Sequence, residues 1–184
     1  MPLKTIENLD VTGKIVLVRC DFNVPISEDG EISDISRIER HAPTIITLVN
    51  KGAKVALLSH FGRPGGKFDE NFSLGFVSES LSEIFKASEI VVIPDCIGGV
   101  AKQVLNDLPN GGIALLENVR FYEGEEKNDD SFCKSLADLA DIYINDSFSV
   151  CHREHASVHG ITKFLPSFAG LALQLEIEML EKVL

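Results

Sequence analysis

Five short hydrophobic runs are spaced along the chain, and most of them are rich in β-branched residues. Their apolar positions are nearly continuous instead of alternating with polar ones. This pattern is typical of strands that are buried on both faces of a parallel sheet. The runs are KIVLVRC at residues 14–20, KVALL at 54–58, EIVVIP at 89–94, GIALLENV at 112–119 and DIYIND at 141–146.

Amphipathic segments lie between these runs and predict helices. The longest covers residues 33–52, where apolar residues recur at helical spacing after a Ser-Asp pair that could provide the N-cap. Gly52 is a natural C-terminal stop, and Pro43 should kink this helix or split it in two. Further helices are expected at residues 73–86, 98–108, 129–140 and 170–184.

The alternation of strands and helices predicts the fold class. It favours right-handed βαβ units in an α/β fold, with a doubly wound, Rossmann-like parallel sheet and helices on both faces. The expected architecture is therefore a three-layer α/β/α sandwich. The chain has no internal repeat and no linker-like change in composition, so we expect a single domain.

Composition and charge exclude several classes of partner. The chain has 184 residues, 45% of them hydrophobic, which is enough for one core. Its formal net charge of −11 argues against nucleic-acid binding and against a membrane-surface role. No run approaches the ~18 apolar residues that span a bilayer, and the first residues do not resemble a signal peptide. The four cysteines form no C-x-x-C pair, so we expect reduced thiols in a cytoplasmic protein.

Basic and polar residues follow several of the predicted strands, at the edge where open parallel sheets bind ligands. Their convergence on one rim predicts a small pocket for a compact ligand that carries more than one negative charge. The residues are Asp21 and Asn23 after the first run, Arg37 at the start of the next helix, His60 and Arg63 after the second run, Arg120 after the fourth and Arg153 after the fifth. Two other basic residues, Arg19 and Arg40, are placed differently along the chain and do not belong to this candidate set.

Each of these residues also has an ordinary explanation. A lone arginine after a strand is usually a solvated surface charge, and a single histidine can be a hydrogen-bonded structural residue. An aspartate in such a position can simply close a turn. However, several separate connections each place such a residue at the same edge of the sheet. This favours a binding site over a series of coincidences.

Other motifs in the chain fit known sites poorly. GRPGGKF is one residue short of a Walker A loop and has Phe68 in place of the hydroxyl residue. His152, His155 and His159 lack the glutamate of a zinc-binding H-E-x-x-H motif, so no metal site is expected. A metal-dependent hydrolase that uses His152, His155 and Asp146 is a weak alternative. EGEEKNDD, at residues 123–130, is interpreted as a solvated acidic loop.

Five sequence blocks resemble the N-terminal domain of the phosphoglycerate kinase family. The resemblance implies a glycolytic phosphotransferase that moves a phosphoryl group reversibly between Mg-ATP and the carboxylate of 3-phosphoglycerate, through 1,3-bisphosphoglycerate. In that family this half of the enzyme holds the phosphoglycerate. The blocks are VRCDFNVP, SRIERHAPTI, GAKVALLSHFGRP, LLENVRFYEGEEKND and ADIYINDSFSVCHREHAS, in the order and spacing of the family.

The resemblance also implies a role for each candidate residue. Asp21 and Asn23 match positions that contact the hydroxyl and carboxyl end of the substrate. Arg37 matches the arginine that reaches the transferring phosphoryl group and is therefore the expected catalytic residue, and it is also expected to belong to the substrate-binding set. The group that grips the 3-phosphate is matched by His60, Arg63, Arg120 and Arg153.

The resemblance implies a division of the complete enzyme into two halves. Residues 1–170 are expected to form the phosphoglycerate-binding domain, and residues 171–184 to begin the interdomain helix. The C-terminal nucleotide-binding domain would be absent, and with it the site for Mg-ATP. We therefore expect an excised domain that binds 3-phosphoglycerate in the micromolar to millimolar range and is itself inactive. The complete enzyme is expected to be a monomer.

A few positions depart from the commonest family pattern, although none of them replaces a ligand contact. They are Cys20, Ser147, Ser149 and Cys151. These departures leave open whether Cys151, beside the arginine cluster, has a lowered thiol pKa. A non-catalytic anion-binding module on the same scaffold is the alternative to a kinase half, because a fold does not determine a function.

Overall fold

The computed structural model describes residues 3–87 and 89–183, and its strands form one parallel sheet. The strand order is β3-β4-β2-β1-β5-β6, so β1 and β2 lie in the middle. The strands are β1 (Ile15–Arg19), β2 (Lys54–Leu58), β3 (Ile90–Val92), β4 (Ile113–Leu115), β5 (Ile142–Asn145) and β6 (Ser167–Ala169). Every recorded pairing between them is parallel, which confirms the fold class predicted from the hydrophobic runs.

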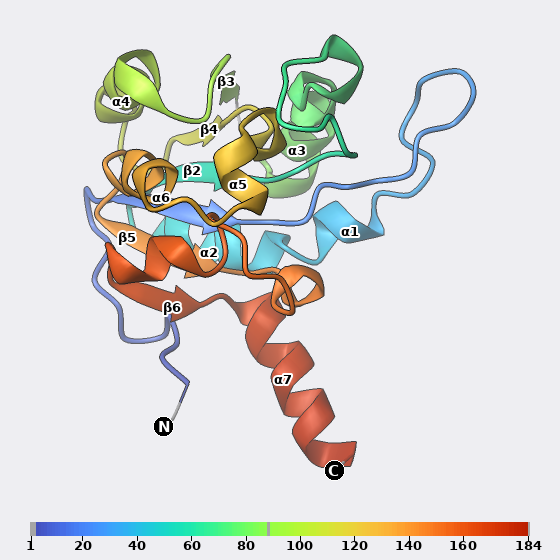
Figure 1. Cartoon of the computed structure of the whole chain (residues 1–184). Helices are drawn as coiled ribbons and strands as arrows, with labels where there is room; N and C mark the ends of the chain where they lie inside the picture. The colour runs from blue at the N-terminus through green and yellow to red at the C-terminus, as the bar shows by residue number, and fades with distance from the viewer. Residues whose placement is uncertain (1–2, 88, 184) are drawn as a thin grey trace.

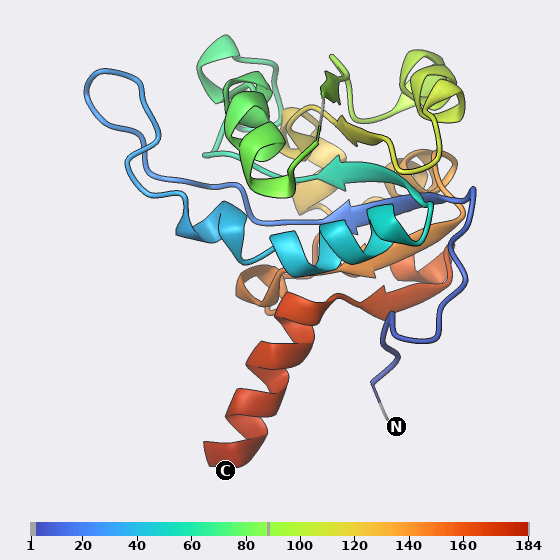
Figure 2. The same cartoon turned by 180° about the vertical axis from the view of Figure 1, so that it is seen from behind.

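Helices cover both faces of the sheet (Figures 1 and 2). Helices α1 to α3 pack on one face, whereas α4 and α6 pack on the other. The helices are α1 (Ser36–Glu39), α2 (Ala42–Asn50), α3 (Ser78–Phe85), α4 (Gly98–Asp107), α5 (Glu123–Glu126), α6 (Asp130–Ala137) and α7 (Leu171–Val183), with short 3₁₀ turns that include η3 (Val119–Phe121) and η4 (Phe148–Val150). Within the described ranges, no helix is both long and apolar enough to traverse a bilayer.

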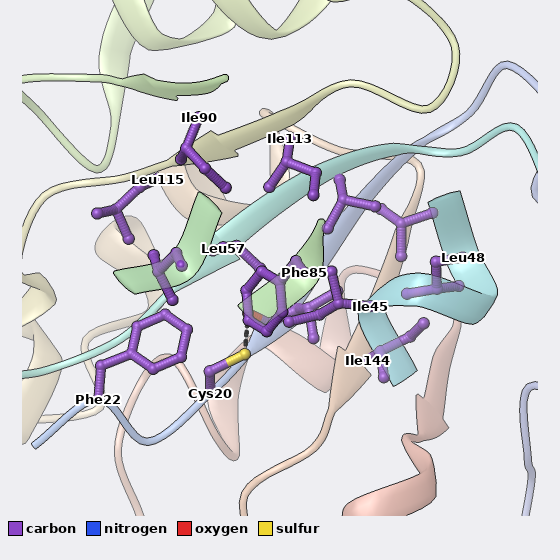
Figure 3. Packing of buried hydrophobic residues seen from close by; sticks show 14 of the residues in the cluster. Cys20, Phe22, Ile45, Leu48, Leu57, Phe85, Ile90, Ile113, Leu115 and Ile144 are labelled. Atoms are coloured by element: carbon purple, nitrogen blue, oxygen red, sulfur yellow. Dashed lines mark hydrogen bonds between the residues drawn. The ribbon is translucent and has the colours of Figure 1, made fainter. Parts of the chain in front are cut away.

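Successive residues of the central strands feed two separate hydrophobic clusters. In β2, Val55 and Leu57 face the cluster under α1 to α3, whereas Ala56 and Leu58 face the cluster under α4 and α6. Figure 3 shows Leu57 of β2 among side chains from several other elements, including Phe85 of α3. Because both faces are covered, these strands need apolar side chains at every position, and this produces the continuous runs of the sequence.

Pro43 divides the long helix predicted at residues 33–52 into α1 and α2. It occupies one of the first two positions of α2, where a backbone N–H has no partner within the helix, so its missing donor costs nothing there. The segment ends as predicted, because Gly52 adopts a φ of +76° and its N–H donates to the Val49 carbonyl at 2.9 Å.

The interpretation of residues 123–130 as a solvated acidic loop is wrong for Glu125. This segment contains the short helix α5, and the Glu125 side chain is fully buried. Its carboxylate accepts hydrogen bonds from the Ser157 hydroxyl at 2.6 Å and from the Ser157 backbone N–H at 2.9 Å. These partners come from a segment that is distant in sequence, so charge composition alone gave no indication of this burial.

Helix α7 projects from the body of the molecule (Figures 1 and 2). Leu173 in its first turn is buried. Farther along α7, four large apolar side chains are exposed: Leu175, Met179, Leu180 and Val183. The first turn therefore belongs to the fold, whereas the rest of the helix presents an apolar surface to solvent.

Truncation of Leu57 tests the packing between the sheet and α2 and α3. Leu57 is fully buried, so Leu57→Ala should lower the free energy of unfolding by about 2–5 kcal/mol through lost apolar contact and a residual cavity. The matched control is Leu175→Ala at a side chain that is 52% exposed, and it should change stability by less than about 0.5 kcal/mol. Urea denaturation measures both, and equal effects would contradict the burial described here.

Candidate functional site

The candidate residues lie at the carboxyl edge of four neighbouring strands, β4, β2, β1 and β5. The register pairs Arg19 at the end of β1 with Leu58 of β2 and with Asn145 of β5, so these strands end level with one another. The connections that follow them therefore begin side by side. They carry Asp21 and Asn23 after β1, Arg37 in α1, His60 and Arg63 after β2, Arg120 in η3 and Arg153 after η4.

Asp21 is a buried carboxylate with a fixed orientation. Its Oδ2 accepts from the Arg37 guanidinium at 2.8 Å and from the Ser149 hydroxyl at 2.7 Å, and its Oδ1 accepts from the Asn23 N–H at 3.1 Å. Burial raises the pKa of Asp21, but the hydrogen bond from Ser149, the electrostatic influence of His60, the hydrogen bond from the Asn23 N–H and the Arg37 charge together outweigh burial, so the pKa lies below its ordinary value. The group is therefore an anion with acceptor capacity left for a ligand hydroxyl.

Asn23 joins the connection after β1 to the connections after β2 and β4. Its Oδ1 accepts from the Gly62 N–H at 2.9 Å, and the Gly62 carbonyl accepts from the Arg120 guanidinium at 2.7 Å. Gly62 has a φ of +58°, and a Cβ there would lie 2.3 Å from the Phe72 ring. The chain thus needs glycine at this position for its backbone and for packing.

Two buried arginine nitrogens have unused hydrogen-bonding capacity. Within the described residues, Nε of Arg120 and Nε of Arg153 are buried without an acceptor. The Glu126 carboxylate lies 3.6 Å from Nε of Arg120, beyond hydrogen-bond length. Buried donors without acceptors are rare in native structures because they are costly. An anion with several oxygens could accept from both guanidinium groups.

Arg19 belongs to this edge of the sheet, although the sequence analysis left it out. Its side chain is 1% exposed and lies 2.9 Å from Nδ1 of His60. Burial, followed by the charges of Arg19 and Arg120, lowers the pKa of His60 from 6.5 to about 2 against the opposing influence of Asp21. His60 is therefore neutral at physiological pH. An arginine that ends an apolar run gives no indication in the sequence of which residues it meets.

Arg37 and Arg63 are the more accessible arginines of the candidate set. The Arg37 side chain is 44% exposed and is held by its ion pair with Asp21. Arg63 is exposed, and within the described residues it makes no recorded hydrogen bond or ion pair with another candidate residue. Arg153 is close enough to influence both His60 and Arg120 electrostatically. The structure therefore links the candidate residues by contact or charge, with Arg63 as the exception.

The carboxyl end of β5 also anchors the start of α7. Asp146 is 1% exposed, and its Oδ2 lies 2.8 Å from Nδ1 of His41. Its Oδ1 accepts from the Thr44 hydroxyl at 2.7 Å and from the Ala172 N–H at 3.0 Å. On the other side of the ring, Nε2 of His41 accepts from the Asp21 N–H at 3.0 Å. One buried carboxylate thus connects the Asp21 backbone with the first turn of α7.

The residues of the metal-dependent alternative, His152, His155 and Asp146, do not share a site with one another. His155 lies 3.7 Å from the Glu125 carboxylate, Asp146 is engaged as described above, and His152 is exposed. Across residues 3–87 and 89–183, no cluster of three or more His, Cys, Asp or Glu side chains is arranged to hold a metal ion. The geometry therefore gives the hydrolase hypothesis no support.

The Cys151 thiol is not activated by the neighbouring arginines. Burial raises its pKa, and a hydrogen bond from Asn145 and the charge of Arg19 lower it by less, so the net shift is upward. Its Sγ donates to the Ser147 carbonyl at 3.3 Å and accepts from the Asn145 amide at 3.4 Å. At neutral pH it is therefore a protonated thiol and a poor nucleophile.

Comparison with known proteins identifies the family. A family model described as phosphoglycerate kinase matches residues 6–184. The chain belongs to the phosphoglycerate kinase family. A solved phosphoglycerate kinase structure from Coxiella burnetii superposes with a TM-score of 0.90 at 37% sequence identity, and the match covers 100% of this chain and 45% of that chain.

Curated phosphoglycerate kinases show the same relationship. The protein of Bartonella quintana (strain Toulouse) is 52% identical over 182 residues, covering 99% of this chain and 45% of the relative. The protein of Caulobacter vibrioides (strain NA1000 / CB15N) is 48% identical over 184 residues, covering 100% of this chain and 46% of the relative. The chain therefore spans slightly less than half the length of these phosphoglycerate kinases.

The neutral state of His60 predicts a pH dependence of stability. Below pH 6.5 the unfolded imidazole takes up a proton, whereas the folded one does so only near its pKa of about 2. The unfolded state thus binds more protons in this window, and stability falls as the pH is lowered. Between pH 7 and pH 5, urea unfolding should show that the wild type loses up to about 2 kcal/mol more than His60→Gln.

The control for this measurement is His152→Gln, because His152 is exposed. This variant should keep the pH dependence of the wild type. If His60→Gln and the wild type lose the same stability between the two pH values, His60 ionises normally in the folded protein and its described environment is wrong.

Proposed function

We propose that this chain binds 3-phosphoglycerate and supplies the acceptor-substrate half of a phosphoglycerate kinase. The observation that carries the proposal is a pair of buried donor atoms at the carboxyl edge of the sheet, Nε of Arg120 and Nε of Arg153, which have no acceptor among the described residues. A phosphate group offers several acceptor oxygens to such donors. The family assignment supports phosphoglycerate as the molecule that carries this phosphate.

The two ends of the ligand would meet different chemistry. The phosphate end would lie against Arg63, Arg120, Arg153 and neutral His60, which together can donate to several oxygens. The hydroxyl and carboxyl end would lie against Asp21 and Asn23, where a carboxylate acceptor suits a hydroxyl. Because Asp21 is ionised and held by neighbouring donors, it would require a donating group on the ligand at that point.

Arg37 is the proposed catalytic residue. Its guanidinium is half exposed and is oriented by Asp21 at 2.8 Å, so it can turn one side toward a phosphoryl group that arrives from solvent. Phosphoryl transfer requires mainly positioning and stabilisation of charge on the moving oxygens. A preoriented arginine supplies both without acting as an acid or a base.

The complete reaction would require a second half. Residues 1–170 would form the phosphoglycerate domain, and residues 171–184 would begin the helix that leads to a nucleotide-binding domain for Mg-ATP. The exposed apolar residues of α7 support this division, because such a surface is normally covered. The present chain would then bind its substrate without turnover. The complete protein would be a monomeric cytoplasmic enzyme of glycolysis.

Calorimetric titration with 3-phosphoglycerate tests the binding site. The wild type should bind saturably in the micromolar to millimolar range, and added salt should weaken binding. Arg120→Ala should weaken binding by about 10- to 100-fold, because it removes charge-assisted hydrogen bonds. Arg40→Ala is the matched control, since Arg40 pairs with Glu176 on the surface and lies outside the candidate set. It should bind like the wild type.

Two outcomes would contradict this proposal. An absence of heat at millimolar 3-phosphoglycerate would remove the ligand assignment. Equal affinity for 3-phosphoglycerate and for inorganic phosphate would favour a general anion-binding module, because Asp21 and Asn23 would then contribute nothing.

A complementation assay tests the division of labour. The isolated chain with Mg-ATP and 3-phosphoglycerate should form no detectable 1,3-bisphosphoglycerate. Addition of a nucleotide-binding half from a phosphoglycerate kinase should restore phosphoryl transfer, and Arg37→Ala should abolish that gain even at saturating 3-phosphoglycerate. Turnover of ATP by the isolated chain would contradict the proposed division.

A further inference from the structure

Among the residues that the structure describes, Arg19 is a buried cation with no carboxylate partner. Its side chain is 1% exposed, and within the described residues it forms no ion pair. Its Nε donates to the Ser157 hydroxyl at 2.9 Å, one terminal nitrogen donates to the Cys20 carbonyl, and the other lies 2.9 Å from Nδ1 of His60. A guanidinium in such a place is costly, because its charge is removed from water without a direct counter-charge.

The compensation for this charge is indirect. The Ser157 hydroxyl accepts from Arg19 and donates to Glu125 Oε1 at 2.6 Å, while the Ser157 N–H donates to Glu125 Oε2 at 2.9 Å. The Glu125 carboxylate is therefore connected to the Arg19 guanidinium only through Ser157, without direct contact. This leaves the terminal nitrogens of Arg19 directed at neutral acceptors, one of which is the His60 ring.

The contact between Arg19 and His60 determines the protonation of the ring. A guanidinium has donors and no acceptor, so the ring nitrogen that it meets must offer a lone pair. Nδ1 of His60 is thus unprotonated, and the single proton of the neutral ring is on Nε2. The charged groups that influence His60 are Arg19 from β1, Arg120 from η3, Arg153 from the segment after η4, and Asp21 from the connection after β1. Three of these are cations, and they oppose a second ring proton.

We propose that Arg19 is a positioning residue of the anion site. It holds His60 as a neutral imidazole with its proton on Nε2, so that Nε2 donates a hydrogen bond to the bound phosphoglycerate. The ligand named here rests on the proposed function, whereas the tautomer rests on the Arg19 contact alone. Without Arg19, the ring could place its proton on either nitrogen or take up a second proton, and a fixed donor toward the ligand would be lost.

A purely structural role for Arg19 makes different predictions. If Arg19 only tied the end of β1 to the segment around Ser157, its replacement would change stability and leave the His60 tautomer unaltered. The tautomer is therefore the measurement that separates positioning from packing.

Nitrogen-15 NMR of the imidazole rings gives this readout in the unliganded chain. In the wild type, the His60 resonances should show an unprotonated Nδ1 and a protonated Nε2 from pH 7.5 to pH 5.0, with no titration. A proton on Nδ1, or titration near pH 6.5, would overturn the proposal in the wild type alone, whatever the variants do.

Two variants extend the test. Arg19→Met removes the charge and keeps a long apolar side chain, so His60 should show mixed tautomers and should titrate within the same pH range. Affinity for 3-phosphoglycerate should fall by at least about tenfold, the effect of losing one hydrogen bond to a charged ligand. Arg40→Met changes an exposed arginine in the same way and should alter neither the tautomer nor the affinity.

Thermal unfolding of each variant separates loss of fold from loss of positioning. If Arg19→Met does not fold, Arg19→Lys keeps a cationic donor, so its His60 should remain neutral with the proton on Nε2 and affinity for 3-phosphoglycerate should be largely retained; a tenfold loss of affinity with an unchanged tautomer would contradict the inference. The proposed function and this inference can fail separately. A wild type that does not bind 3-phosphoglycerate contradicts the function, whereas unchanged tautomer and affinity in a folded Arg19→Met contradict the inference.

Discussion

The parallel register of β1 with both of its neighbours determines where the candidate site forms. Because β1 is paired with β2 on one side and β5 on the other, the three strands end at the same level. The connections after them therefore start within a few ångströms of one another, and residues more than a hundred positions apart become neighbours. Asp21 and Ser149 illustrate this, with a hydrogen bond of 2.7 Å across 128 positions of sequence. A slip of either strand pairing would separate the groups and would also move apolar side chains out of both hydrophobic clusters.

Electrostatics at this edge are opposite in sign to the molecule as a whole. The chain carries a net charge of −11, yet Arg19 and Arg120 are buried beside a histidine that remains uncharged. Burial makes these cations costly, and the cost is of the order of several kcal/mol for each unpaired ion. A bound anion would offset that cost directly. The stability of the unliganded edge is therefore lowered by the same charges that make it suitable for an anion.

Sequence reasoning succeeded where the physical cause was local and failed where it was not. The runs around β1 and β2 were found because a strand buried on both faces must be apolar throughout, and Pro43 divided its helix as expected because its ring excludes a helix interior. The strand β6 was missed because it has three residues, of which only Ala169 is buried. Arg19 and Glu125 were misjudged because a charged residue is buried only when its partners are present, and those partners come from other parts of the chain. The roles of the site residues toward a ligand stay predictions.

The buried pair of His41 and Asp146 has a consequence for the mechanics of the chain. The imidazole accepts from the backbone of Asp21, and the carboxylate accepts from the backbone of α7, so both segments share one set of solvent-inaccessible hydrogen bonds. Breaking any one of these hydrogen bonds would leave a buried polar group without a partner. The ligand edge and the root of the projecting helix therefore constitute a single cooperative unit, and local opening of one entails opening of the other.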